Sequence, residues 1–299
     1  MNYECKAETG IQLLARSGTR PKVKGIDQSL FFRDVSCSPD NGDTLEVSGD
    51  GSVGKTLFVT QLMAQCILPR RIIVDGVDIH VGGLDAGAVF INTDHHFQIP
   101  KLVQIMEQRL RNCKINKSDA ELSQIMEKHM ENGLTKLMIL NCYDSAQLMA
   151  TFFSLEKHLS DNRSVALVVL DSATAFYWQD VCSSNVSDKR MDSYLKSVLS
   201  TFEKCVKGSS VLIVYTRPKY FYSKNPVNVK NPGPSSSGEK HKFTIQLSHL
   251  EADEEKILLN SDRLSAVKCK AVINTPKSSF ECRYYISSQG IMYPDKDGD

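Results

Sequence analysis

The chain has 299 residues, of which 41% are hydrophobic and 24% charged, and its formal net charge is +1. This composition is typical of a soluble globular protein with one large domain or two small ones, and the near-neutral charge excludes a general affinity for polyanions. The nine cysteines form no C-x-x-C pair, which indicates reduced thiols of the cytosol or nucleus, and neither a secretory signal nor an apolar run long enough to span a membrane is visible.

Residues 1–40 are mixed and modestly basic, and we expect them to form a lead-in to a core that covers residues 41–299. The core opens with a short strand expected over residues 44–47. A full match to the phosphate-binding loop pattern G-x-x-x-x-G-K-[ST] follows it, at Gly49, Asp50, Gly51, Ser52, Val53, Gly54, Lys55 and Thr56. Apolar residues then recur at helical spacing and predict a helix that ends near Pro69.

This loop predicts a site for ATP and Mg²⁺. Its glycines allow the backbone to curl so that several N–H groups point inward at the phosphates. Lys55 can reach the outer phosphates, and the Thr56 hydroxyl can ligate Mg²⁺. The N-terminus of the following helix would point at the phosphates, where its partial positive charge favours an anion.

From residue 69 to residue 216 the chain alternates between strands and helices. The glycine-rich stretch 69–88 predicts a surface hairpin or loop. Strands are expected over residues 89–94, 134–140, 165–170 and 211–215, and helices over residues 99–110, 118–130, 146–159 and 188–206. This alternation predicts an α/β fold with a mostly parallel twisted sheet and helices on both faces.

Polar residues stand at the ends of three of these strands, where open α/β sheets place ligand chemistry. Asp171 follows one apolar strand, and its carboxylate is the candidate to hold Mg²⁺ through water, or else a helix cap. Asp94 ends another strand, and it either orients a water for attack on the γ-phosphate or caps the next segment. After Thr216, Arg217 is either a contact to phosphate or DNA or the solvated start of a loop.

Residues 217–241 are rich in Pro, Asn, Ser and Gly, which predicts a flexible loop. Over residues 217–242, six basic residues oppose one acidic residue, with aromatic residues among them. Cations neutralise phosphates and exposed rings stack on unpaired bases, so the stretch is either a single-stranded DNA surface or a loop with incidental charge. The candidate DNA contacts are Arg217, Lys219, Tyr220, Tyr222, Lys224 and Lys230.

Residues 243–290 change character and predict a C-terminal β-hairpin region. Antiparallel strands are expected over residues 243–247, 256–259, 264–273 and 280–286, with a hairpin connection over residues 274–277. The strands extend the α/β core rather than forming a separate unit.

The order of these motifs resembles the core of the RecA-like recombinases and their eukaryotic paralogues. The likeness runs from about residue 7 to residue 217 and is closest to the smallest of the paralogues. It is carried by residues 66–69 (C-I-L-P), 90–97 (F-I-N-T-D-H-H-F) and 170–178 (L-D-S-A-T-A-F-Y-W).

This resemblance implies an ATP-binding subunit of a nuclear paralogue complex that acts in homologous recombination. Such a subunit stands beside the paralogue called D, binds single-stranded and branched DNA, and assists filament assembly by the main recombinase, also at replication forks. Residues 1–43 alone precede the first expected strand, so the family's N-terminal helical domain is expected to be missing. The chain would then bind the linker of a neighbouring subunit but have no such linker of its own. It would therefore cap one end of a short filament-like stack of subunits.

Two departures bear on catalysis. Active recombinases that resemble this core carry Glu where Asp94 stands and Gln where Arg217 falls. Asp is one methylene shorter than Glu, and a misplacement of about 1 Å can cost roughly a hundredfold in rate. Weak or absent hydrolysis is therefore expected. Two alternatives stay open: a DNA-stimulated ATPase or strand-exchange motor, and a protein scaffold with a relic phosphate loop.

Overall fold

A computed structural model describes residues 9–10, 20–27, 30–31, 38–113, 115, 117–183, 190–221, 242–250, 267–287 and 290–293. Within these residues the strands form a nine-stranded sheet of order β11-β10-β9-β8-β1-β7-β6-β4-β5 and a separate hairpin, β2-β3. The strands of the large sheet are β1 (Thr44–Gly49), β4 (Gly87–Asn92), β5 (Leu137–Asn141), β6 (Val165–Asp171), β7 (Leu212–Pro218), β8 (Lys242–His249), β9 (Val267–Asn274), β10 (Ser279–Ser287) and β11 (Gly290–Met292).

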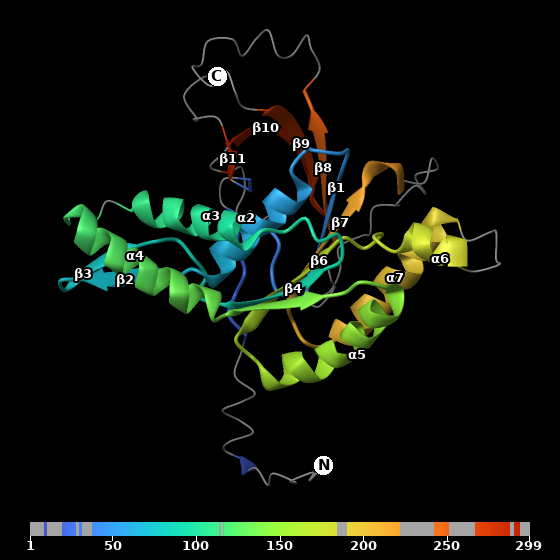
Figure 1. The fold of residues 1–299 in the computed structure, drawn as a ribbon, viewed down its shortest axis with the longest axis horizontal. Helices are drawn as coiled ribbons and strands as arrows, with labels where there is room; N and C mark the ends of the chain where they lie inside the picture. Colours follow the sequence, from blue (N-terminus) through green and yellow to red (C-terminus); the bar gives the residue numbers. More distant parts are fainter. Residues whose placement is uncertain are drawn as a thin grey trace.

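Helices cover both faces of the sheet (Figure 1). They are α2 (Lys55–Ile67), α3 (Ile99–Arg111), α4 (Asp119–Leu134), α5 (Ser145–Asp161), α6 (Tyr177–Ser183) and α7 (Met191–Val206), with a 3-10 turn, η2 (Lys219–Phe221), after β7. The core side chains of α2, α3 and α4 belong to one hydrophobic cluster, and those of α5 and α7 belong to a second. Alternate residues of β4 divide between the clusters, because successive side chains of a strand point to opposite faces.

The strands from β8 to β5 pair in parallel, and β9, β10 and β11 pair antiparallel. Every residue of β1, β4 and β6 is buried, as expected for parallel strands covered on both faces. The predicted RecA-like α/β fold with an antiparallel C-terminal extension is confirmed.

The junction of the two parts is β8, which runs parallel to β1 and antiparallel to β9. The sequence predicted an antiparallel strand over residues 243–247. This prediction is wrong for the pairing of β8 with β1, which is parallel. The turn after β9 is the predicted hairpin connection, and the expected strand over residues 256–259 lies outside the described residues.

The 69–88 stretch contains the expected hairpin, with β2 (Arg71–Val74) paired antiparallel to β3 (Val77–His80). Helix α4 begins with the predicted capping box, in which Ser118 and Glu121 bond reciprocally. None of the described helices is long and apolar enough to cross a bilayer.

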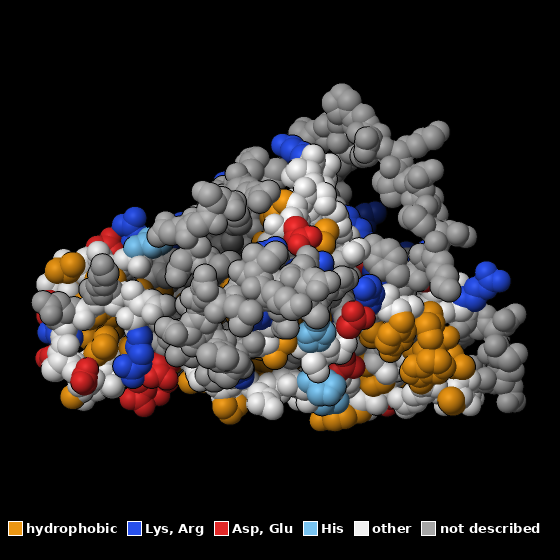
Figure 2. Space-filling view, turned by 90° about the horizontal axis from the view of Figure 1, so that it is seen from above, with side chains coloured by type: hydrophobic (Ala, Val, Ile, Leu, Met, Phe, Trp, Pro, Cys, Tyr) orange, Lys and Arg blue, Asp and Glu red, His pale blue; other side chains and the backbone are white. Residues whose placement is uncertain are grey.

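The aromatic stretch after β6 is divided between core and surface. Phe176 and Tyr177 are buried, whereas Trp178 is 56% exposed. Figure 2 shows hydrophobic side chains gathered over α6 toward the right of that view.

The lead-in to the core is fastened by one arginine. Arg20 is buried, and its guanidinium donates to four carbonyl oxygens, those of Leu159, Asn162, Val165 and Ser209. These carbonyls belong to the end of α5, the start of β6 and the chain before β7. Burial, and then repulsion from Arg163, lower the pKa of Arg20 to about 10, so the side chain remains charged at neutral pH.

We expect Arg20→Met to lower the free energy of unfolding by about 3 kcal/mol, because hydrogen bonds from a charged group are lost and buried carbonyls are left without their donor. Urea denaturation measures the change. Arg111→Met is the matched control, since Arg111 pairs with Glu107 on an exposed helix face, and it should cost less than about 0.5 kcal/mol. Equal losses of unfolding free energy in the two variants would contradict the anchoring role of Arg20.

Candidate nucleotide-binding site

The phosphate-loop sequence joins the end of β1 to the start of α2. Ser52 and Gly54 have φ angles of 60° and 84°, in the left-handed region, and Gly54 is the N-cap of α2. Successive residues that alternate in this way turn backbone N–H groups into one concavity, which suits an anion. The positive φ of Gly54 favours glycine there, and a Cβ on Gly54 would lie 2.9 Å from the terminal methyl carbon of Ile286, which would have to shift.

Lys55 folds back over the loop. Its Nζ donates to the carbonyl oxygens of Gly49 and Asp50, at 3.1 and 2.7 Å. Burial lowers the pKa of Lys55, and the nearby charges of Asp171, Asp94 and Asp50 oppose that shift. The predicted phosphate-binding cation and the two predicted strand-end carboxylates therefore share one electrostatic environment.

Asp171 ends β6 and is 3% exposed. The hydroxyl of Thr216 donates to its carboxylate, and the Thr56 hydroxyl lies near enough to lower the pKa of that carboxylate. Burial raises the pKa of Asp171, and the two hydroxyls and the Lys55 charge oppose the rise only in part. The structure thus brings Thr56 and Asp171 together, as the sequence interpretation required.

These two side chains present the hard oxygen atoms that Mg²⁺ prefers. Over the described part of the chain, no group of three or more His, Cys, Asp or Glu side chains could hold a metal ion by itself. A magnesium ion at Thr56 and Asp171 would therefore take its other ligands from water and from a bound phosphate. That donor set fits a nucleotide-dependent site.

The backbone locks the neighbouring strand ends to each other. The N–H groups of Thr93 and Asp94 donate to the Asp171 carbonyl at 2.9 and 3.2 Å, and Ala173 N–H donates to the Thr216 carbonyl at 3.0 Å. Thr93 also bonds Ser172 through its hydroxyl. Asp94 is consequently fixed beside Asp171 and half-buried, while its role toward water stays a prediction.

The comparisons with known proteins identify the family of the chain. No family model matches the chain. The DNA repair protein XRCC2 of Mus musculus is 33% identical over 232 residues, which cover 78% of this chain and 74% of the mouse protein. The chain belongs to the XRCC2 family of DNA repair proteins. The XRCC2 homolog of Arabidopsis thaliana is 23% identical over 225 residues, 66% of this chain and 59% of the length of that protein.

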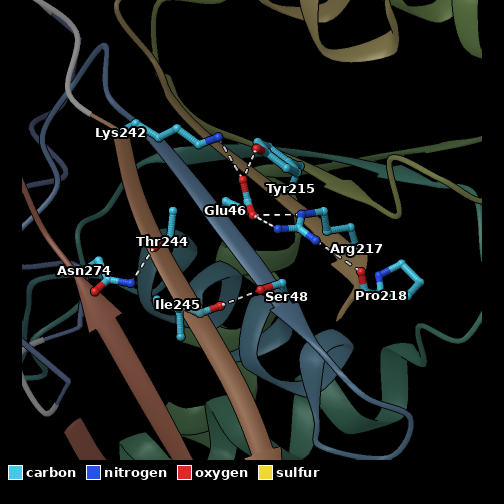
Figure 3. Close-up of polar contacts among 9 residues, drawn as sticks. All are labelled: Glu46, Ser48, Tyr215, Arg217, Pro218, Lys242, Thr244, Ile245 and Asn274. Atoms are coloured by element: carbon cyan, nitrogen blue, oxygen red, sulfur yellow. Dashed lines mark hydrogen bonds and ion pairs between the residues drawn. The ribbon is translucent and has the colours of Figure 1, made fainter. Parts of the chain in front are cut away.

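In this XRCC2-family chain Arg217 is not the solvated start of a loop. It lies in β7, is 4% exposed, and pairs with Glu46 of β1, with 2.8 Å between its Nε and the Glu46 Oε1 (Figure 3). Tyr215 and Lys242 bond the other carboxylate oxygen at 2.6 and 2.9 Å. The contact of Arg217 to phosphate or DNA stays a prediction.

The other candidate DNA contacts divide into two groups. Lys219 and Tyr220 are described and exposed, and the Lys219 Nζ lies 3.7 Å from a carboxylate oxygen of Asp50 in the phosphate loop. Tyr222, Lys224 and Lys230 lie outside the described residues.

Sequence reasoning missed Glu46. The available signal was an acidic residue within a strand otherwise suited to the core, which requires buried partners. Burial alone would raise the pKa of Glu46, but the charges of Lys242 and Arg217 and the Tyr215 hydrogen bond together outweigh burial, and the pKa is lowered.

We expect Glu46→Gln to lower the free energy of unfolding at pH 7 by about 3 kcal/mol, because the buried Arg217 loses its counter-charge. The pKa of Glu46 is below its ordinary 4.5 in the folded state, so its contribution is complete above pH 4.5 and is lost as the pH falls through the folded value. The difference in the free energy of unfolding between wild type and Glu46→Gln should therefore become smaller below that pH.

Urea unfolding at a series of pH values between about 3 and 7 measures this gap. Glu127→Gln, on the exposed face of α4, serves as the control and should show no gap at pH 7. A gap for Glu46→Gln that stays constant across the series would rule out the ionic origin.

Proposed function

We propose that this XRCC2-family chain is an ATP-binding subunit of a recombinase paralogue complex in homologous-recombination DNA repair. It works in the nucleus, binds single-stranded or branched DNA within that complex, and assists recombinase filament assembly, also at replication forks. The observation that supports ATP binding most directly is that Thr56 of the phosphate loop lies close enough to the buried Asp171 for its hydroxyl to lower the pKa of that carboxylate.

Each residue of the site has a role in this proposal. The N–H groups of residues 49–56 bind the phosphates, and Lys55 exchanges its two carbonyl contacts for phosphate oxygens. Thr56 ligates Mg²⁺, and Asp171 holds it through water. The bound Mg²⁺ neutralises phosphate charge.

Hydrolysis is proposed to be weak or absent. Asp94 is close enough to Lys55 and Asp171 to affect their pKa values, yet its carboxylate is one methylene shorter than that of a glutamate. The same closeness favours the second candidate function, a DNA-stimulated ATPase in which Asp94 positions water.

ATP would act on stability as well. In the ligand-free protein the ionised Asp171 lowers the free energy of unfolding at neutral pH, because burial raises the pKa of this carboxylate. A bound Mg²⁺ gives this charge a partner. A ligand that binds only the folded state stabilises it by about 2.7 kcal/mol at a hundredfold excess over Kd.

The expected result of a thermal-shift measurement is a rise in Tm when ATP and Mg²⁺ are added to the purified full chain. Lys55→Ala should abolish the rise, whereas Lys128→Ala, an exposed lysine of α4, should retain it. Asp171→Asn should also abolish the rise while its ligand-free Tm equals or exceeds that of wild type, because a buried charge is removed. Absence of a shift in wild type would count against ATP binding.

Complex formation is proposed to use the β5 edge of the sheet. Among the described strands β5 is last in the order, so one side of its backbone is unpaired. A groove of about 330 Å³ lies beside it, lined by Met138 and Leu140 of β5 and by Leu155 and His158 of α5. The groove is also lined by Ser154, Lys157 and Asp161, and a free strand edge beside a groove of mixed apolar and polar lining suits an extended linker of a neighbouring paralogue.

Co-purification with the D-type paralogue tests this docking site. Met138→Glu places a charge in the groove and should abolish recovery of the paralogue, since a buried unpaired carboxylate is costly. The control is Ile73→Glu, which alters an exposed apolar residue of the β2-β3 hairpin and should leave recovery unchanged. Equal recovery with both variants would place the interface elsewhere.

A further inference from the structure

The phosphate loop is flanked by the C-terminal strands as well as by β1 and α2. The Tyr284 hydroxyl, on β10, donates to the Val53 carbonyl at 2.7 Å, and this contact is buried. At the end of β8, the Nε2 of His249 lies 3.3 Å from the Gly51 carbonyl oxygen. Two alternate carbonyls of one loop thus bond side chains more than 190 residues away in the sequence.

A third side chain joins these two. The Sγ of Cys269, on β9, lies 3.9 Å from the Nδ1 of His249 and close enough to Tyr284 to influence the pKa of its hydroxyl. Tyr284 and Cys269 are directly opposite each other in the β9-β10 pairing, and both are buried. The pair is therefore held by the sheet register, so the hydroxyl has little freedom to leave Val53.

Peptide geometry gives these contacts a consequence for the loop. In a trans peptide unit the C=O and the following N–H point in opposite directions. Fixing the Val53 carbonyl toward Tyr284 turns the Gly54 N–H the other way, and fixing the Gly51 carbonyl toward His249 does the same for the Ser52 N–H. Gly54 and Ser52 are the two residues with left-handed φ, which shape the concavity.

Packing limits the loop on the same side. A Cβ on Gly49 would lie 2.7 Å from the Leu247 carbonyl oxygen of β8. A Cβ on Gly54 would lie 2.9 Å from the terminal methyl carbon of Ile286 on β10. The C-terminal sheet therefore touches the loop at both ends.

We propose that the C-terminal sheet completes the phosphate-binding site, with Tyr284 and His249 as positioning residues that aim the N–H groups of Gly54 and Ser52 into the concavity. The proposal rests on ATP binding by the phosphate loop, and it adds a requirement for strands β8 to β10. Neither residue needs to touch the nucleotide.

The test compares Tyr284→Phe with Tyr285→Phe in the full chain. Both remove one hydroxyl from a buried tyrosine, but adjacent side chains of a strand point to opposite faces, so only the first removes the bond to Val53. Hydrogen–deuterium exchange of residues 49–56 in the nucleotide-free chain reports loop order, and titration with ATP and Mg²⁺ reports affinity. The ligand-free Tm monitors folding.

Tyr284→Phe is expected to speed exchange in residues 49–56 and to raise the Kd about tenfold, the effect of one lost hydrogen bond of about 1.4 kcal/mol. Tyr285→Phe should leave both readouts unchanged. His249→Ala, at an exposed side chain whose loss leaves the core intact, should raise the Kd in the same direction.

Unchanged exchange and unchanged Kd in Tyr284→Phe would overturn the proposal, as would faster exchange with an unchanged Kd. A lower Tm without any change in affinity would reduce Tyr284 to a structural role. If wild type binds no ATP, ATP binding itself fails, and the exchange comparison still decides whether the C-terminal sheet orders the loop.

Discussion

The parallel register of β1, β7, β6 and β4 is the constraint on which the site depends. In this register Gly49 pairs with Pro218, Leu170 with Tyr215, and Asn92 with Asp171. The carboxyl ends of four strands that are distant in sequence therefore lie at one sheet edge, where ligand sites of open α/β sheets form. A slip of one residue in any of these pairings would turn its strand-end side chain to the opposite face.

Two buried carboxylates illustrate how charge is distributed in this chain. Glu46 is surrounded by Lys242, Arg217 and Tyr215, and its pKa is lowered. Asp171 accepts a hydrogen bond from Thr216 and is otherwise desolvated, and its pKa is raised. Glu46 thus has its counter-charges within the fold, whereas Asp171 lacks a full counter-charge among the groups around it. An incompletely compensated buried charge in a cleft is a common property of functional residues, and this contrast separates the structural carboxylate from the candidate ligand.

Local patterns were enough to predict the phosphate loop, the helix after it and the strand that ends at Asp171, because glycine spacing and apolar periodicity are written in neighbouring residues. They did not predict that Glu46 meets Arg217 and Lys242, or that Tyr284 meets Val53. Those contacts depend on the order of strands in the sheet, which periodicity does not specify. The parallel pairing of β8 with β1 was missed for the same reason. The expectation that Arg217 starts a solvated loop is wrong because the apolar run ends at Tyr215, whereas β7 continues to Pro218.

The contacts of Arg217 and Lys242 to Glu46 also bear on which changes of sequence the fold tolerates. Arg217 and Lys242 lie on β7 and β8, on either side of β1, and both bond the Glu46 carboxylate of that strand. Because both residues bond the Glu46 carboxylate, their positions are fixed relative to each other. The entropic cost of closing a loop between two fixed positions grows only slowly with the length of the loop. Changes in the length of the sequence between Arg217 and Lys242 should therefore cost little folding free energy.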